Sequence, residues 1–191
     1  MDFFNYDNKT TPGKGKILIA EPFLADPNFE RSIILLCEHN EEGSFGFVLN
    51  KPIEIKMDDI LDDLPIANIP LHLGGPVQQN TFHFLHKNES VTGAKKTGNG
   101  IYWGGEFDEI KELMQVGLYK ENDYKYFLGY SGWGENQLEE EINSGSWIVA
   151  DKVDPVLIFH TSTEDLWKIA LKSLGGRFSV YSNYPVDPSL N

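Results

Sequence analysis

The sequence predicts an α+β protein built on one mixed β-sheet with three or four helices packed against it. Apolar runs of strand length alternate with turns that contain glycine or proline, and only a few segments show the spacing of a helix. Hairpins and crossover helices both occur among them, and that mixture favours α+β. At 191 residues and 40% hydrophobic content, the chain suits a single domain over residues 1–191.

The first half of the chain is expected to supply most of the eight or nine strands. Residues 1–14 are polar and predict a loose N-terminal arm before a strand at Ile17–Ala20. The apolar runs Ser32–Glu38 and Phe45–Leu49 flank the turn signal NEEG, so they predict a hairpin with a loop of three to five residues. Met57–Leu64 predicts a short helix that ends before a proline. Further strands are expected at Leu71–Leu73, Thr81–Leu85 and Ile101–Trp103.

Two similar strand-turn-helix units follow. Tyr102–Gly117 and Gly129–Gly145 each read as an aromatic strand end, a glycine turn, a helix that starts with acidic residues, and a closing glycine. Both helices are expected to lie on the sheet. In the first helix, four apolar side chains recur at spacings of three and four: Phe107, Ile110, Leu113 and Met114.

The last helix has clear start and stop signals. Ser162 or Thr163 is expected to cap its N-terminus, and Gly175-Gly176 its C-terminus. Residues 177–191 are expected to form a loop-like tail. The apolar face of the helix is expected to consist of Leu166, Ile169, Ala170 and Leu174. Two further strands are expected before it, at Trp147–Ala150 and Val156–Phe159.

Composition excludes several classes of function. The formal charge of -13 disfavours direct binding to nucleic-acid phosphates. The single cysteine, Cys37, excludes an intramolecular disulfide and a cysteine-rich zinc site. No apolar run reaches the roughly 20 residues of a membrane helix and no signal peptide is evident, so we expect a cytoplasmic protein without membrane contact. No cofactor or metal is expected. The carboxylates of Asp58-Asp59-x-x-Asp62-Asp63 could hold Mg²⁺ from one side of a helix, but a solvated helix face is the favoured interpretation. His83 and His86 lack a third ligand at a diagnostic spacing.

Two segments allow an enzymatic alternative. Gly129-Tyr130-Ser131-Gly132-Trp133 has the setting of a nucleophile elbow, with Asp154 and His160 later in hydrolase order, but Trp133 stands where a small residue is required. A glycine turn with a buried tryptophan is the favoured interpretation. Cys37 and His39 are two apart on a strand and would share a face, which would activate a thiol for redox chemistry. A buried core thiol is the favoured interpretation there.

Four blocks of sequence, in order, resemble the YqgE/AlgH family, also called UPF0301 or DUF179. They are LIAEPFLADPNFERSIILLCEHNEEGSFGFVLNKP, LHLGGPVQQNTFHFLH, YWGGEFDEI and FLGYSGWGENQLEEEINSGSWI. The resemblance covers about Gly15 to Gly175. It implies a bacterial, cytoplasmic α+β domain with a bent, partly barrel-like sheet, and it supplies no catalytic residues. It also brings the label of a transcriptional regulator, although the acidic charge argues against direct binding to duplex DNA.

The leading hypothesis is therefore a non-enzymatic regulatory or binding module that acts through a small ligand or a protein partner. The rival hypotheses are a hydrolase that uses Ser131, thiol chemistry at Cys37, and a DNA-binding regulator. The candidate functional residues are the polar positions within the matched blocks, together with the cysteine: Asp26, Arg31, Cys37, His39, Asn50, Lys51, Gln78, Ser131 and Gln137.

Overall fold

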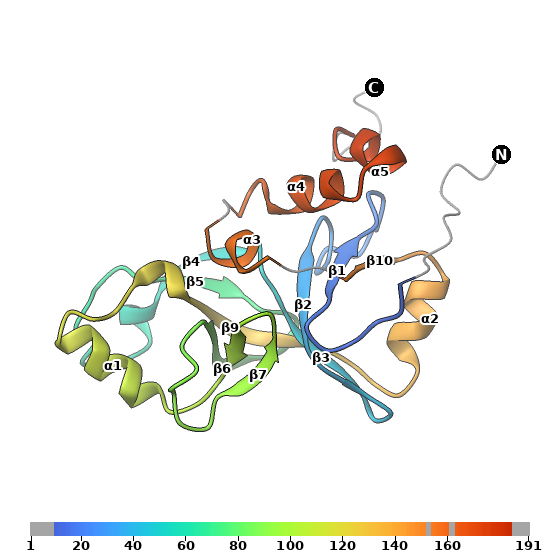
Figure 1. Cartoon of the computed structure of the whole chain (residues 1–191). Coiled ribbons are helices and arrows are strands. Elements are labelled where there is room, and N and C mark those ends of the chain that lie inside the picture. Colours follow the sequence, from blue (N-terminus) through green and yellow to red (C-terminus); the bar gives the residue numbers. More distant parts are fainter. Residues whose placement is uncertain (1–9, 152–153, 161–162, 185–191) are drawn as a thin grey trace.

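One open, mixed β-sheet organises the chain, and five α-helices pack around it (Figure 1). The structure is a computed structural model, and it describes residues 10–151, 154–160 and 163–184. The strands are β1 (Ile17–Ala20), β2 (Ile33–Asn40), β3 (Gly43–Val48), β4 (Pro52–Lys56), β5 (Pro70–Leu73), β6 (Val77–His86), β7 (Lys95–Gly98), β8 (Ile101–Trp103), β9 (Tyr124–Trp133) and β10 (Trp147–Ala150). The helices are α1 (Phe107–Gln115), α2 (Gln137–Asn143), α3 (Pro155–Phe159), α4 (Leu166–Ser173) and α5 (Gly176–Tyr181).

The long strand β9 belongs to both halves of the sheet. The strand order is β10-β1-β2-β3-β9-β6-β8-β7, with β4 and β5 joined to β9 off this path. The end of β9 pairs antiparallel with β3, where Ser131 lies opposite Gly46. Its earlier residues pair antiparallel with β6 and parallel with β5. The sheet is therefore mixed, as predicted, but it stays open and does not close into a barrel.

The half that contains β1 and β2 is covered on both faces. Ile17 and Ile19 belong to a core cluster with Leu166 and Leu171 of α4. Their neighbour Leu18 faces the opposite side and packs in the cluster that includes α2. Figure 1 shows α3, α4 and α5 together above the sheet, with α2 beside β10. Burial on both faces explains why these strands are continuously apolar in the sequence.

The other half of the sheet packs against α1. Ile110 and Met114 of that helix lie in a third cluster with Tyr124 and Tyr126 of β9. The two tyrosine rings are stacked with their centroids 6.3 Å apart. Because β9 alternates between faces, Phe127 instead belongs to the cluster beneath α4. One strand thus contributes to the cores on both sides of the sheet.

The two halves meet where β5 and the residues after it approach β9. The Gly74 N–H donates to Leu128 O at 2.9 Å, and Gly74 O accepts from Val48 N at 2.8 Å. A Cβ atom on Gly74 would lie 2.3 Å from Gly129 O. Gly129 has φ +67 within β9, a conformation that side-chain-bearing residues rarely adopt. These two glycines are required for the close backbone contact.

Most sequence-predicted strands are confirmed, and β1, β8 and β10 have the predicted bounds. The strands β7 and β8 form an antiparallel hairpin at the edge of the sheet. The loop between β2 and β3 is shorter than predicted, because only Glu41 and Glu42 separate the strands. The helix predicted at Met57–Leu64 is a single 3-10 turn, Met57–Asp59. A second such turn, Glu121–Asp123, precedes β9.

The prediction for Val156–Phe159 is wrong, because the segment is helix α3. Asp154 caps this helix by accepting a hydrogen bond from Val156 N at 2.9 Å, and Pro155 occupies its first turn. In α4 the N-cap is Asp165, while Ser162 lies outside the described residues. Ile169 was expected on the apolar face of α4, but its side chain is 42% exposed. Trp167 and Leu171 are buried instead.

The tail prediction is also partly wrong, because residues 176–181 form α5. Residues 185–191 of that tail lie outside the described residues, as do residues 1–9 of the predicted arm. Residues 10–14 contain neither strand nor helix, as predicted for the arm.

Replacing Gly74 by alanine is expected to lower the free energy of unfolding by about 3 kcal/mol, because the new methyl group would overlap a backbone carbonyl that has no room to move. Chemical denaturation measures the change. The matched control is Gly134→Ala, since a Cβ there meets its nearest atom, Gln137 Oε1, only at 4.0 Å. A Gly74→Ala protein as stable as the Gly134→Ala protein would contradict the close contact.

Candidate functional site

A cleft of about 360 Å³ opens between the sheet and the last two helices. On the sheet side, Arg31 lies just before β2, and Asn50 and Lys51 lie between β3 and β4. On the helix side, Trp167 and Lys168 come from α4, and residues 182–184 follow α5. We call this the basic cleft, because three of its lining side chains are cationic.

Arg31 is held in place by several contacts. Its guanidinium lies 4.8 Å from the ring centroid of Trp167, and Nη2 donates to Tyr184 O at 2.6 Å. Its Nε atom is buried and has no hydrogen-bond partner among the residues that the structure describes. Desolvation lowers the pKa of Arg31 below its usual value. Because Nε is inaccessible, a ligand in the cleft would bind the outer nitrogens of the guanidinium.

Asn50 fixes the backbone that carries Arg31. Arg31 has φ +49, a strained conformation for a residue with a side chain. The Asn50 amide group donates to Arg31 O at 2.9 Å, and its Oδ1 accepts from Ile33 N at 2.9 Å. These two hydrogen bonds clamp the backbone on both sides of Ser32. Asn50 therefore positions Arg31 and need not contact a ligand itself.

Lys51 is the second half-buried cation of the cleft. Its Nζ donates to Pro27 O at 2.9 Å. Asp26 shapes this loop by accepting a hydrogen bond from Asn28 N at 2.8 Å. Desolvation lowers the pKa of Lys51, while Glu30 and Asp26 act in the opposite direction. Within the described part of the chain, neither Lys51 nor Arg31 lies within 4.0 Å of a carboxylate oxygen. An anion could therefore bind both cations without displacing an ion pair.

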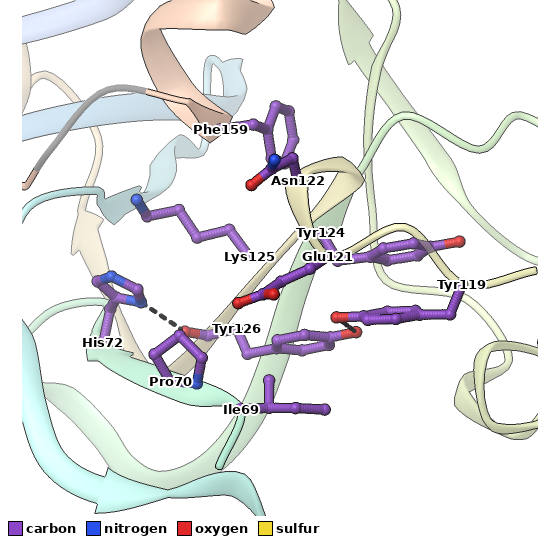
Figure 2. Close-up of a pocket in the computed structure, with 10 residues that line it drawn as sticks. All are labelled: Ile69, Pro70, His72, Tyr119, Glu121, Asn122, Tyr124, Lys125, Tyr126 and Phe159. Carbon is purple, nitrogen blue, oxygen red and sulfur yellow. Dashed lines mark hydrogen bonds between the residues drawn. The ribbon is translucent and has the colours of Figure 1, made fainter. Parts of the chain in front are cut away.

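A second, smaller pocket of about 100 Å³ lies at the other half of the sheet (Figure 2). We call it the lysine pocket, because Lys125 of β9 lines it with its side chain buried. His72 of β5 and the phenol groups of Tyr119 and Tyr126 line it as well. Tyr126 Oη donates to Tyr119 Oη at 3.3 Å, and burial raises the pKa of Tyr119 to about 12.

The basic cleft brings together three of the sequence-predicted residues, and a fourth lies in a neighbouring loop. Arg31, Asn50 and Lys51 line it, and Asp26 belongs to the loop that binds Lys51. Two others lie near α2 instead: His39 contacts Ser44 and Glu139, and Gln137 bonds Gly134 N and Glu141. Gln78 is exposed in β6, where its carbonyl accepts from Thr81. The candidate residues thus do not form one common site.

The predicted nucleophile elbow at Gly129–Trp133 is wrong, and so is the glycine turn that was favoured in its place, because the segment lies within strand β9. Ser131 lies inside β9, fully buried, and its Oγ donates to Gly74 O at 3.1 Å. Asp154 caps α3, and His160 Nε2 lies 3.1 Å from Lys87 Nζ. The three side chains of the hypothetical triad thus have separate partners. Trp133 is buried, as predicted, at 6% exposed.

Cys37 lies in the core and is not paired with His39. The register of β2 shifts between Leu36 and Glu38, which breaks the alternation expected to place both side chains on one face. The Cys37 thiol contacts Leu35 O at 3.9 Å, whereas His39 bonds Ser44. Burial raises the pKa of Cys37 well above its usual value, which is the reverse of an activated thiol.

Sequence reasoning missed Lys125 and Trp167. Lys125 stands in the otherwise aromatic and apolar run Tyr124–Leu128, and a lysine inside such a strand was the available signal. Trp167 was hidden by the assumption that Ile169 faced the core. Among the described residues, no group of three or more His, Cys, Asp or Glu side chains is placed to hold a metal ion. The described helices are all too short or too polar to span a membrane.

The fold defines the class as a single α+β domain with an open mixed sheet, here carrying two polar pockets. The family model described as AlgH-like (DUF179) matches residues 17–179, and the chain belongs to this family. A UPF0301 protein from Cytophaga hutchinsonii is 44% identical over 93% of this chain and 98% of its own length. A UPF0301 protein from Bacteroides thetaiotaomicron is 40% identical, with coverages of 96% and 94%.

Two solved structures share the fold. The solution structure of the AlgH protein from Pseudomonas aeruginosa has a TM-score of 0.72 and 30% identity, and the match covers 93% of this chain and 97% of that one. A crystal structure of a Corynebacterium diphtheriae protein has a TM-score of 0.78 at 24% identity, with coverages of 95% and 97%. The predicted family and α+β class are confirmed, while neither comparison assigns an activity.

Native Cys37 is expected to react with iodoacetamide at least about 100 times more slowly than it does in urea, because its thiolate is disfavoured and its sulfur inaccessible. Mass spectrometry over time measures both rates, and the unfolded chain, with its single cysteine, should take up one label. Rapid labelling of the native protein would restore the thiol hypothesis.

His72 should make the protein sensitive to acid. Burial, and next the nearby Lys125, lower the pKa of His72 from 6.5 to about 3. Between these values the unfolded chain binds a proton that the folded chain does not, so stability is present above pH 6.5 and is lost as the pH falls. His72→Asn keeps a side-chain N–H for Tyr126 O but does not titrate. Its unfolding free energy is expected to fall about 2 kcal/mol less than that of the wild type between pH 7 and 5. Parallel pH curves in denaturant titrations would contradict the buried neutral imidazole.

Proposed function

We propose that this protein is a non-catalytic binding module of the cytoplasm that takes a small anionic ligand in the basic cleft. The observation that carries the proposal is that Arg31 and Lys51 line the same cleft and that their hydrogen bonds go to backbone carbonyl oxygens. The chain as a whole is strongly acidic, with a formal net charge of -13. A cationic site on such a surface favours a compact anion over an extended phosphate backbone.

The chemistry of the cleft suits a phosphate or carboxylate group. A guanidinium offers planar donors that match two oxygens, and an ammonium supplies a point charge beside it. The volume of about 360 Å³ leaves room for an organic part next to the anionic group. Glu30 and Glu164 also line the cleft, and they would repel a ligand with several spread negative charges.

A regulatory role follows from where the cleft lies. Its two walls belong to the sheet and to the helices α4 and α5, which Arg31 connects through Trp167 and Tyr184. Trp167 Nε1 also donates to Ala20 O at 2.9 Å. A ligand that contacts both walls of the cleft would stabilise the packing of α4 and α5 on the sheet, because it binds only when the two walls are together. A protein partner whose binding depends on the position of α4 and α5 would then respond to the ligand.

The test is a thermal-shift screen of phosphate- and carboxylate-bearing metabolites at fixed ionic strength, each paired with its neutral counterpart, such as AMP with adenosine. At least one anion is expected to raise the Tm by about 3 °C or more, with its neutral counterpart inactive. Lys51→Gln is expected to weaken binding of that anion at least tenfold, because it removes one of two desolvated cations.

The control variant is Lys96→Gln, which makes the same change of charge at an exposed residue of β7. It should leave the affinity within about twofold, because screened surface charges contribute little. Equal losses in both variants would show that only net charge matters and would contradict a specific site. A screen in which no anion stabilises the protein would also contradict the proposal.

A further inference from the structure

Lys125 is a buried lysine that the basic cleft does not use. It is 8% exposed, and its Nζ donates to Ile158 O of α3 at 3.3 Å. No carboxylate oxygen of the described chain lies within 4.0 Å of this nitrogen. Burying an ammonium without a counter-charge is unfavourable, so the site favours the neutral amine. Desolvation accordingly lowers the pKa of Lys125 to about 8.

A neutral lysine is a nucleophile, whereas an ammonium is not. With a pKa of about 8, roughly a quarter of the Lys125 side chains carry a free amine at pH 7.5. An exposed lysine carries far less, because its ordinary pKa is near 10.4. The pocket therefore favours amine chemistry at Lys125 at neutral pH.

His72 supplies a hydrogen-bond acceptor on the same side of the pocket. Its Nδ1 lies 3.3 Å from Tyr126 O, and a carbonyl oxygen only accepts, so Nδ1 carries the hydrogen. Nε2 of the neutral ring then has a free lone pair. Figure 2 shows the Lys125 side chain extending over the pocket toward the His72 ring. The Lys125 charge also contributes to the lowered pKa of His72, which requires the two groups to be near each other.

We propose that Lys125 forms an imine with small, neutral carbonyl compounds that enter the lysine pocket. A volume of about 100 Å³ admits a molecule of only a few heavy atoms, such as a two- or three-carbon hydroxyaldehyde. The paired hydroxyls of Tyr119 and Tyr126 can hydrogen-bond its hydroxyl group. Glu121 and Asn122 also line the pocket, and the carboxylate of Glu121 disfavours keto acids.

The reaction balances without an added oxidant or reductant. The Lys125 nitrogen attacks the carbonyl carbon, the C–N bond forms, and the carbonyl oxygen becomes a hydroxyl. One N–H hydrogen moves to the oxygen to make this hydroxyl and the second then protonates it, while the neutral His72 Nε2 accepts a hydrogen bond from the nitrogen and orients it. The C–O bond then breaks, water leaves with both former N–H hydrogens, and the C=N bond remains. Lys125 and His72 are thus the two residues to which the proposal assigns chemical roles.

The test is reductive trapping on the intact protein. The chain is incubated at pH 7.5 with glycolaldehyde and sodium cyanoborohydride, which reduces an imine to a stable hydroxyethyl group. Peptide mapping then gives the rate of labelling at each lysine. We expect Lys125 to be labelled about ten times faster than the exposed Lys120 nearby. Faster labelling at Lys120 than at Lys125 would overturn the proposal. An unlabelled Lys125 would overturn it as well, because the residue would then serve only to hold α3 against the sheet.

Two variants sharpen the result. Lys125→Met keeps the apolar stem and should remove the fast labelling, whereas Lys120→Met should leave it unchanged. His72→Asn keeps the bond to Tyr126 O but removes the lone pair, and it should slow labelling of Lys125 several-fold without affecting Lys120. An unchanged rate in His72→Asn would overturn the role assigned to this imidazole. The wild-type peptide map decides the main point even if a variant folds poorly.

Discussion

The close approach of Gly74 to β9 is the constraint on which the rest of the structure depends. Gly74 links three segments, because its N–H bonds Leu128, its carbonyl accepts from Val48, and the Ser131 hydroxyl donates to the same carbonyl. Without this contact β9 could not pair with β3 at one end and with β5 and β6 along the rest of its length. Ser131, which resembles a nucleophile in the sequence, is a hydrogen-bond donor that stabilises this junction.

Both pockets follow from the same junction. Val48 lies two residues before Asn50, so the bond from Val48 to Gly74 fixes the loop that carries Asn50 and Lys51 into the basic cleft. Lys125 lies on the other part of β9, beneath α3. In both places a cation bonds to backbone carbonyl oxygens and has no carboxylate partner among the described residues. Carbonyl oxygens satisfy the donors without neutralising the charge, and this leaves Arg31 and Lys51 able to attract an anion.

Much of the fold could be predicted from local patterns, and the failures have physical causes. Strands such as Ile17–Ala20 and Trp147–Ala150 are buried on both faces, so their apolar runs are unambiguous. Val156–Phe159 is equally apolar, but Asp154 and Pro155 form a helix start, and this signal outweighs the strand-like composition. For the site, Arg31, Asn50 and Lys51 were named from the sequence. Lys125 and Trp167 could not be assigned to a pocket from the sequence, because their positions depend on contacts between segments distant in the chain.

The central claim is that the basic cleft binds a small anion through Arg31 and Lys51. The most direct measurement is a titration of isotope-labelled protein with inorganic phosphate at constant ionic strength, followed by NMR. We expect saturable shifts of the Arg31 Nε–H, which has no partner within the described part of the chain, and of the Trp167 indole N–H beneath the guanidinium. Shifts that never saturate, or that appear only at exposed lysines such as Lys96, would contradict it.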